Sequence, residues 1–251
     1  MKIPKSHPRY VSLKIRDKIV EGVKKNITSL HGLMAHGRGE AFDYLLREKT
    51  TSEATKAIEA AAALLALAKY PVISVNGNTA ALVPRELVAL SNARNAPLEI
   101  NIFHASKKRE HAIKKQLHIY GAKNILSPGK NTMIKFLESN RKYVNKRGIY
   151  KADVVFVPLE DGDRTEALVR NGKKVIVVDL NPLSRSAQKA TITIVDNIIR
   201  SMPLLISELK KMKGLDNARL RRLISSFSNQ ENLASSIRLI QQNFTEKTKH
   251  L

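Results

Sequence analysis

Short apolar runs alternate with helical patterns between residues 71 and 200 of the chain. Five runs have the length of strands, at 72–75, 98–103, 154–157, 174–178 and 191–195, and residues 124–126 form a shorter one. The segments between them with helical spacing are 84–93, 106–120, 131–147 and 164–171. Alternation of this kind indicates a parallel sheet covered on both faces. We therefore predict an α/β fold with a Rossmann-like parallel sheet of about five strands.

The first 70 residues carry helical periodicity. An apolar stripe predicts an amphipathic helix over residues 11–30, since apolar side chains recur every four residues from Val11 to Val23. We predict a glycine-containing turn at His36-Gly37-Arg38-Gly39-Glu40, with a second helix beginning near Gly39. An alanine-rich helix is predicted at 52–69, because Thr50 or a neighbour is suited to cap its first turn.

Helical patterns return after the last predicted strand. Residues 198–212 and 215–245 predict C-terminal helices that are separated at Gly214, and the residues after about 240 are expected to form a tail. No low-complexity linker divides the chain. We therefore predict one domain with three sections, namely an N-terminal helical section (1–70), a Rossmann-like core (71–200) and C-terminal helices (201–251).

Composition narrows the class of protein. The sequence contains no run of eighteen apolar residues, and its first residues lack the apolar core of a signal peptide. It contains no cysteine, which excludes disulfides and thiolate chemistry. We expect a cytoplasmic protein without a membrane partner.

The chain has a formal net charge of +22, which favours an anionic partner or substrate. Residues 101–151 hold thirteen Lys and Arg against two acids, Glu110 and Glu138. One interpretation is a nucleic-acid-binding α/β protein, whose binding would depend on salt. Aromatic residues, which stack on bases, make up only 5% of the chain and include no Trp. We therefore do not expect nucleic acid, and phosphorylated small substrates explain the charge equally well.

Polar residues follow the predicted strands, at the edge where open parallel sheets bind ligands. The stretch Asp179-Leu180-Asn181 is followed by Arg185-Ser186. Its carboxylate can accept hydrogen bonds from ribose or base, and its arginine and hydroxyl can donate to phosphate. Asn76-Gly77-Asn78-Thr79 follows the first strand and suits a polar acid or a phosphate, although Thr79 is equally suited to cap a helix. His104 ends the second strand and is expected near the site.

Neither standard phosphate-binding loop is present in the sequence. His36-Gly37-Arg38-Gly39-Glu40 is the candidate replacement, because glycines permit close approach of a ligand and Arg38 adds a bidentate cation. Arg16 is placed to reach the same region, and an ordinary interhelical turn is the alternative interpretation. No protein metal site is predicted, because His104, His111 and His118 are too widely spaced for one ion.

Glu160-Asp161-Gly162-Asp163 forms an acidic stretch after another predicted strand. Its carboxylates are suited to Mg²⁺ that arrives with ATP, since Mg²⁺ prefers one or two carboxylates together with phosphate oxygens. They are equally suited to the ammonium group of an amine substrate. A solvated turn is the third interpretation, and the sequence leaves all three open.

The chain resembles archaeal phosphopantothenate synthetases, also called 4-phosphopantoate–β-alanine ligases, from near residue 5 to about residue 212. The resemblance lies in blocks that recur in the same order and spacing. These blocks are His7-Pro8-Arg9-Tyr10, Arg16, Ser29-Leu30-His31-Gly32-Leu33, His36-Gly37-Arg38-Gly39-Glu40-Ala41-Phe42-Asp43-Tyr44-Leu45, Asn76-Gly77-Asn78-Thr79-Ala80-Ala81-Leu82 and Asp179-Leu180-Asn181-Pro182-Leu183-Ser184-Arg185-Ser186.

The resemblance implies a homodimeric enzyme of archaeal coenzyme A biosynthesis. Such an enzyme joins 4-phosphopantoate to β-alanine while converting ATP, with Mg²⁺, to AMP and pyrophosphate. The reaction is expected to pass through an acyl-adenylate. A related ligase that uses another acid and amine is the alternative.

The resemblance also assigns site residues by motif. It implies that ATP is bound by Arg16, Arg38, Asp179, Leu180, Asn181, Arg185, Ser186, Asn197 and Ile198. Our hypothesis is that phosphopantoate is bound by Asn76, Asn78, Thr79, His104 and Lys107. The residues expected to assist catalysis are Arg38, Arg185 and His104, because cations stabilise the anionic transition states of this chemistry.

Overall fold

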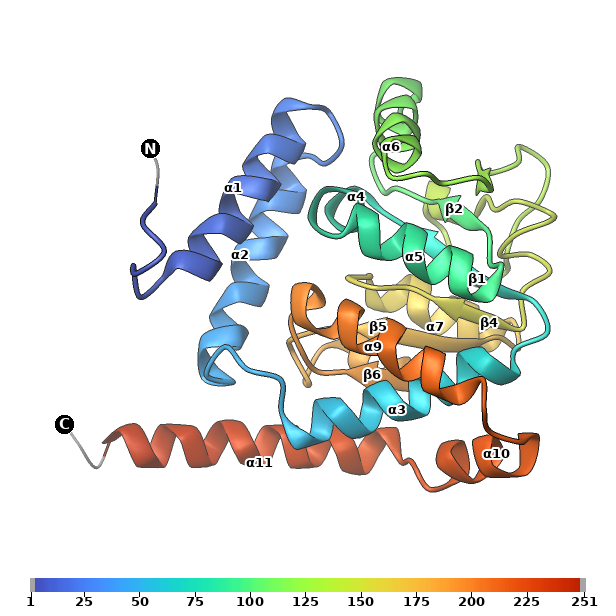
Figure 1. Cartoon of the computed structure of the whole chain (residues 1–251). Coiled ribbons are helices and arrows are strands. Elements are labelled where there is room, and N and C mark those ends of the chain that lie inside the picture. The colour runs from blue at the N-terminus through green and yellow to red at the C-terminus, as the bar shows by residue number, and fades with distance from the viewer. Residues whose placement is uncertain (1–2, 249–251) are drawn as a thin grey trace.

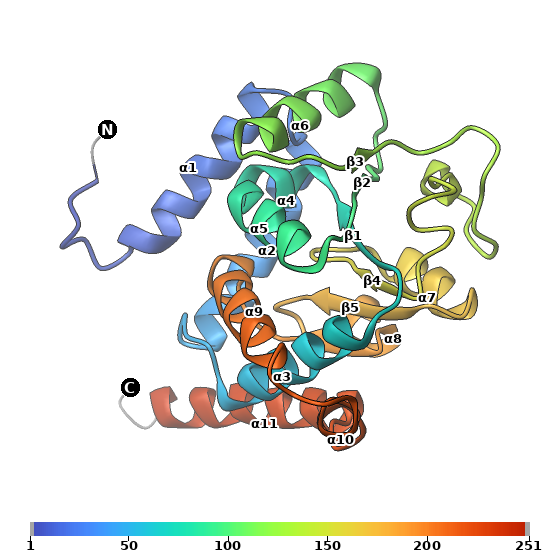
Figure 2. The same ribbon diagram turned by 45° about the vertical axis from the view of Figure 1, so that its right-hand side comes forward.

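A six-stranded, all-parallel sheet forms the centre of the molecule (Figures 1 and 2). The structure is a computed structural model that describes residues 3–248. Its strands lie in the order β3-β2-β1-β4-β5-β6. Their bounds are β1 (Pro71–Val75), β2 (Leu98–Ile100), β3 (Ile125–Leu126), β4 (Val154–Phe156), β5 (Lys174–Val178) and β6 (Ile192–Ile194). The order reverses between β1 and β4, which leaves a crevice beyond the carboxyl ends of these two strands.

The predicted α/β fold with a Rossmann-like parallel sheet is therefore confirmed, with six strands instead of about five. Strand β5 illustrates why both faces of the sheet are covered. Successive strand residues point to opposite faces. Val175 and Val177 belong to one apolar core, whereas Ile176 and Val178 belong to the other. Both faces of β5 are therefore apolar, as expected for a strand buried between two layers.

Helices cover the two faces unequally. The larger core lies against α3 (Ser52–Leu67), α5 (Pro84–Arg94), α6 (Lys107–Ile119) and α9 (Ile198–Met212). The other face is covered by α7 (Gly162–Arg170), α8 (Arg185–Lys189) and an irregular segment, residues 127–152. None of the helices in the described range is long and apolar enough to cross a membrane.

The remaining helices lie around this layered core (Figure 1). They are α1 (Tyr10–Lys24), α2 (Leu30–Leu45), α4 (Gly77–Leu82), α10 (Asn217–Ser225) and α11 (Asn229–Thr248). Helices α1 and α2 stand beside the carboxyl ends of the strands, and α11 runs along α3 to the far end of α2. The predicted C-terminal helix over 215–245 is thus two helices, and its predicted tail is helical up to Thr248.

The N-terminal prediction was wrong in one respect that matters for the site. The predicted helix over 11–30 ends at Lys24, and α2 begins at Leu30 instead of near Gly39. Ser29 caps α2, since its side chain accepts a hydrogen bond from the Gly32 amide. Gly37 and Gly39 lie inside this helix, which tolerates them since each glycine destabilises a helix by only about 1 kcal/mol relative to alanine. The stretch from His36 to Glu40 is therefore neither a turn nor a helix start.

The predicted helix over residues 131–147 was also wrong. This segment contains only one short 3-10 turn, η1 (Asn140–Lys142). Two side chains at β2 and directly after it form hydrogen bonds with backbone groups of this segment that a helix would pair internally. The Glu99 carboxylate accepts from the amides of Asn145 (2.8 Å) and Ile149 (2.6 Å). The Asn101 amide donates to the carbonyls of Arg141 (3.1 Å) and Tyr143 (3.2 Å).

Candidate active site

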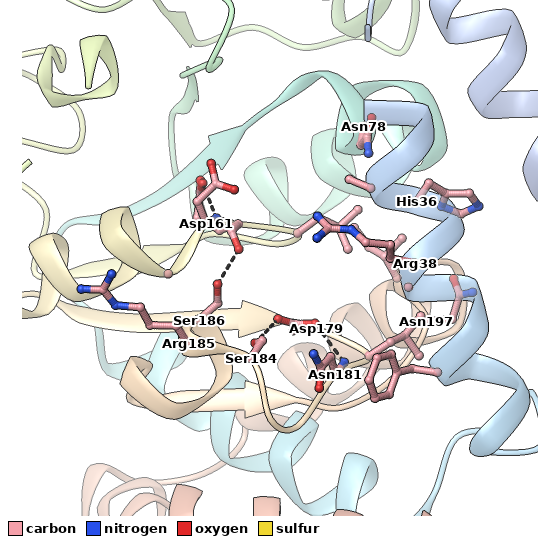
Figure 3. A pocket seen from close by; sticks show the side chains of 18 of the residues that line it. His36, Arg38, Asn78, Asp161, Asp179, Asn181, Ser184, Arg185, Ser186 and Asn197 are labelled. Atoms are coloured by element: carbon pink, nitrogen blue, oxygen red, sulfur yellow. Dashed lines mark hydrogen bonds between the residues drawn. The ribbon is translucent and has the colours of Figure 1, made fainter. Parts of the chain in front are cut away.

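A cavity of about 390 Å³ opens at the carboxyl ends of β4 and β5, beneath α2 (Figure 3). We call it the larger hollow, and its volume is typical of small-molecule sites, which measure about 300–1,000 Å³. A second cavity of about 320 Å³, the smaller hollow, adjoins it on the side of β1 and β2. The wall common to both is formed by Ala35, Arg38, Asn78, Leu159 and Asp161.

The turn after β5 forms one wall of the larger hollow. The Asp179 carboxylate accepts from the Asn181 amide (2.9 Å) and from the Ser184 hydroxyl. Ser184 in turn caps α8, because its side chain accepts from the Ala187 amide (2.9 Å). Burial raises the pKa of Asp179, against the hydrogen bonds and the nearby Arg38 that lower it. A carboxylate has about four acceptor sites, so Asp179 can still accept from a ligand.

Arg38 enters the cavity from the opposite wall. It lies in the middle of α2, and its side chain extends across the opening (Figure 3). Arg38 is exposed, and its guanidinium donates no hydrogen bond to any residue between 3 and 248. Its five N–H donors are therefore available to a bound anion. Its positive charge also lowers the pKa of Asp179 on the facing wall, against the burial that raises it.

The start of α9 supplies a third wall. Asn197 caps this helix, since its side chain accepts from the Ile199 amide (3.1 Å). Its amide group donates to Asp43 on α2 (2.7 Å), and Arg200 binds the same carboxylate. These contacts fix α2 over the strand ends. They place Asn197 and Ile198 in the lining of the larger hollow.

A strained residue lies between the two hollows. Leu159 has φ of 56°, in the left-handed region that side chains other than glycine rarely adopt. Two hydrogen bonds hold it there, from its amide to Val178 (3.1 Å) and from the Asn76 side chain to its carbonyl (2.9 Å). Such strain persists where the surroundings determine it, and it concentrates at functional sites.

Five basic side chains belong to the lining of the smaller hollow. They are His31, Arg38, His104, Arg109 and Arg141. The rings of His31 and His104 lie 4.7 Å apart. Arg109 donates to the His104 carbonyl (2.8 Å), while its buried Nε finds no hydrogen-bond partner among residues 3–248. Burial lowers the pKa of Arg109. This concentration of cations and donors suits a phosphate group.

The residues after β1 form a helix start whose side chains are largely used within the protein. Asn76 and Thr79 make a capping box for α4, and Thr79 is fully buried. The Asn76 amide also donates to Pro158 (3.1 Å) across the crevice. Asn78 reaches both hollows, although its amide donates to Gly32 (2.9 Å). The structure thus places Asn78 at the cavity surface and gives Thr79 a capping position.

A buried ionic network lies beneath the common wall. Glu160 accepts from Arg141 and Arg164, and all three side chains are at most 5% exposed. Arg164 also donates to the Ser74 hydroxyl (3.2 Å). The two arginines lower the pKa of Glu160, although burial alone would raise it. Glu160 is therefore committed to the network and is not available to a ligand.

Arg16 lies on the far side of α2 from the larger hollow. Its guanidinium makes a paired contact with Glu40, at 2.7 and 2.8 Å, and this contact raises the pKa of Arg16. It lines a separate cavity together with His36 and Tyr44. His36 also faces the larger hollow, and its buried Nε2 has no hydrogen-bond partner in the described part of the chain.

The structure gathers most of the predicted nucleotide residues around one cavity. The larger hollow is lined by Arg38, Asp179, Leu180, Asn181, Arg185, Ser186, Asn197 and Ile198. The smaller hollow adds Asn76 and His104. Neither hollow is lined by Arg16, Thr79 or Lys107. Arg185 points partly away and pairs with Glu166 (2.5 Å).

Sequence reasoning missed three residues with a place in this site. Arg109 was one of many basic residues on a predicted helix, and nothing in its spacing set it apart. His31 lay within a block of the family resemblance, but no role was assigned to it. His36 was part of the predicted turn, and only the helical geometry of α2 turns it toward the cavity.

A Rossmann-like sheet with two adjoining hollows at the point where its strand order reverses is typical of the class of α/β proteins that bind small molecules at this edge. A sequence model of the family described as phosphopantothenate/pantothenate synthetase matches residues 53–243. The chain belongs to this family, which confirms the resemblance predicted from the sequence.

Curated relatives cover almost the whole chain. A protein of Thermococcus onnurineus is 51% identical over 247 residues, covering 98% of this chain and 95% of the relative. One of Thermococcus kodakarensis is 51% identical over 244 residues, covering 97% and 94%. One of Methanosarcina mazei is 48% identical over 240 residues, covering 96% and 94%. Each is named 4-phosphopantoate–beta-alanine ligase.

Proposed function

We propose that this protein is an ATP-dependent ligase that joins 4-phosphopantoate to β-alanine in archaeal coenzyme A biosynthesis. The products are 4′-phosphopantothenate, AMP and pyrophosphate. The name of its relatives supports the two substrates. The observation that carries the proposal is the pair of adjoining hollows, which suits two phosphorylated molecules held side by side.

ATP is assigned to the larger hollow. Asp179 and Asn181 offer acceptors and donors to the ribose or the base, and Leu180 and Ile198 offer apolar surface. Arg38 has unused donors for the phosphates, and the first turn of α9 presents backbone N–H groups. The assignment of Arg16 to ATP needs a movement of α2 or a second chain, because Arg16 faces another cavity.

4-Phosphopantoate is assigned to the smaller hollow. Its phosphate fits the basic group formed by His31, His104 and Arg109. Its carboxylate then lies toward the common wall, next to Arg38 and Asn78. This orientation brings the carboxylate to the α-phosphate of ATP, as formation of an acyl-adenylate requires. Arg38 stabilises the negative charge that develops there.

Mg²⁺ is proposed as a companion of ATP. The described residues contain no group of three or more His, Asp or Glu side chains placed to hold a metal ion. Mg²⁺ commonly keeps several waters and binds through phosphates and one or two carboxylates. The protein would therefore supply few of its ligands. The homodimer and the cytoplasmic location remain predictions.

The proposal is tested by incubating the purified protein with Mg-ATP, 4-phosphopantoate and β-alanine, leaving out each in turn, and measuring AMP. We expect AMP with all three components and almost none without the acid. Absence of AMP under every condition, together with salt-sensitive binding of RNA or DNA, would support a nucleic-acid-binding protein instead.

A further inference from the structure

Asp161 lies where the two hollows meet. It follows β4 and is the N-cap residue of α7, and it belongs to the wall common to both hollows. Figure 3 shows it on the side of the cavity toward which the Arg38 side chain extends. If the acid is joined to ATP across this wall, Asp161 lies beside the bond that an amine must attack.

Asp161 differs from the other two carboxylates that line the hollows. Glu160 is committed to Arg141 and Arg164, and both oxygens of Asp179 accept hydrogen bonds from its own turn. Asp161 accepts from Arg141 through Oδ2 (2.9 Å), whereas its Oδ1 receives no hydrogen bond from residues 3–248. Its side chain is 57% exposed. It therefore presents an unused carboxylate oxygen to the cavity.

Arg141 fixes the position of this carboxylate. Arginine has five N–H donors, and those of Arg141 go to Asn101, Glu160 and Asp161. No donor remains for a substrate, so Arg141 acts as a positioning residue. Partial burial of the carboxylate and the neighbouring Glu160 raise the pKa of Asp161, which makes it a better proton acceptor than an aspartate surrounded by water alone.

We propose that Asp161 binds the ammonium group of β-alanine and accepts the proton that this group loses before it attacks. The inference rests on the proposed ligase function and deepens it, because it assigns the amine to a side chain. An ammonium needs an anionic partner when it leaves water. Within the lining of the two hollows, Asp161 is the carboxylate with an open oxygen.

One ammonium proton moves to Asp161, and the freed nitrogen lone pair forms a bond to the carbonyl carbon of the acyl-adenylate. The bond between this carbon and the phosphate oxygen breaks, and AMP leaves with the electron pair. The nitrogen then loses a second proton to water, which yields the amide. Asp161 returns its proton to solvent before the next cycle.

The test separates the two halves of the reaction in Asp161→Asn. The first half is followed without amine, by exchange of labelled pyrophosphate into ATP in the presence of 4-phosphopantoate. The second half is followed with β-alanine and, separately, with hydroxylamine. Hydroxylamine is largely uncharged at neutral pH and needs neither an ammonium site nor a base. Asp163→Asn is the matched control, because Asp163 is in the same stretch but lines neither hollow.

We expect Asp161→Asn to keep pyrophosphate exchange and hydroxamate formation at the wild-type rate. Synthesis with β-alanine should fall about 100-fold, with a raised KM for β-alanine, as for loss of a general base. Asp163→Asn should retain all three activities. Asp161→Ser is assayed in parallel so that the result does not depend on the folding of one variant, since serine is also favoured at a helix N-cap position and the Asp161 side chain itself makes no capping hydrogen bond.

Two results would overturn the inference. One is undiminished synthesis with β-alanine in both variants. The other is a parallel loss of exchange, hydroxamate and amide in folded variants, which would place Asp161 in ATP or Mg²⁺ binding. Failure of the proposed function is distinguishable, because the wild-type protein itself would then show no exchange, no hydroxamate and no AMP.

Discussion

The common wall of the two hollows and the ionic network beneath it use the same residue types in opposite ways. In the network, Arg141 and Arg164 are buried and both bind the buried carboxylate of Glu160. At the cavity surface, Arg38 donates to no described residue, and Asp161 keeps an open oxygen. The exposed fractions of the Glu160 and Asp161 side chains are 0% and 57%, although the two residues are adjacent.

This difference distinguishes charged side chains that stabilise the fold from charged side chains that are available to a ligand. A buried charge is tolerated when it is paired with an opposite charge and hydrogen-bonded, so the paired charges of the network hold the strand ends in place. An unpaired cation at a cavity wall contributes little to the fold and remains free for a ligand. Substitutions in the network should therefore change stability, and substitutions at the wall should change activity.

The largest effect is expected for Glu160→Gln. This change leaves two buried guanidinium groups without their shared carboxylate, and breaking a buried ion pair destabilises by about 3–5 kcal/mol. The free energy of unfolding is measured by denaturant titration, with Glu59→Gln as the control because Glu59 is exposed on α3. A loss no larger than that of the control would mean that the network does not stabilise the fold.

Arg38→Ala should have the second largest effect, on activity alone. Loss of a cation that stabilises transition-state charge should lower kcat/KM for ATP by about 100-fold. The free energy of unfolding should stay unchanged, because Arg38 binds no described residue. Arg85→Ala is the matched control, since Arg85 is exposed on α5 and lines neither hollow. Unchanged turnover in Arg38→Ala would contradict the phosphate role.

A third prediction concerns Glu99, which anchors the irregular segment against the sheet. Burial raises the pKa of Glu99 to about 7, against the backbone hydrogen bonds that lower it. The folded state thus holds this proton more tightly than the unfolded state, in which Glu99 has the ordinary glutamate pKa of 4.5. The contribution to stability is fully present below pH 4.5 and is lost as the pH rises through about 7.

The comparison of wild type with Glu99→Gln isolates this contribution. The free energy of unfolding of wild type, minus that of the variant, should fall by roughly 1–3 kcal/mol across that pH interval. The amide of the variant introduces a constant offset that does not depend on pH. A difference that is flat, or that rises with pH, would show that burial of Glu99 does not dominate its pKa.

The smallest effect is expected at Gly37, a glycine of α2 that lies away from the ionic network. A Cβ at Gly37 would meet no atom within 4 Å. Gly37→Ala should therefore stabilise the protein by about 0.5–1 kcal/mol through helix propensity. Gly77→Ala is the contrasting variant, because its Cβ would lie 2.7 Å from the Ile27 carbonyl and should destabilise. The melting temperatures of the two variants are compared with that of the wild type. A lower melting temperature for Gly37→Ala would contradict the open space around this glycine.

Much of the sheet and of the site lining was predictable from the sequence. Apolar runs located the strands, and polar residues after them, such as Asp179 and Asn78, were expected at one edge. They do line one cavity. The prediction failed where distant residues decide local structure. Glu99 and Asn101 hold residues 141–149 in an irregular path, and no property of that segment alone shows this.

The sequence by itself determined the strands, the family and the edge of the sheet at which polar residues gather. It could do so because the carboxyl ends of parallel strands share one edge whatever the details of packing. Tertiary structure decided which polar groups remain open. Thr79 and Glu160 are used by the fold, whereas Arg38 and Asp161 face the cavity. Hydrogen-bond partners come from segments far apart in the chain, so only the folded molecule shows which donors and acceptors are left for a ligand.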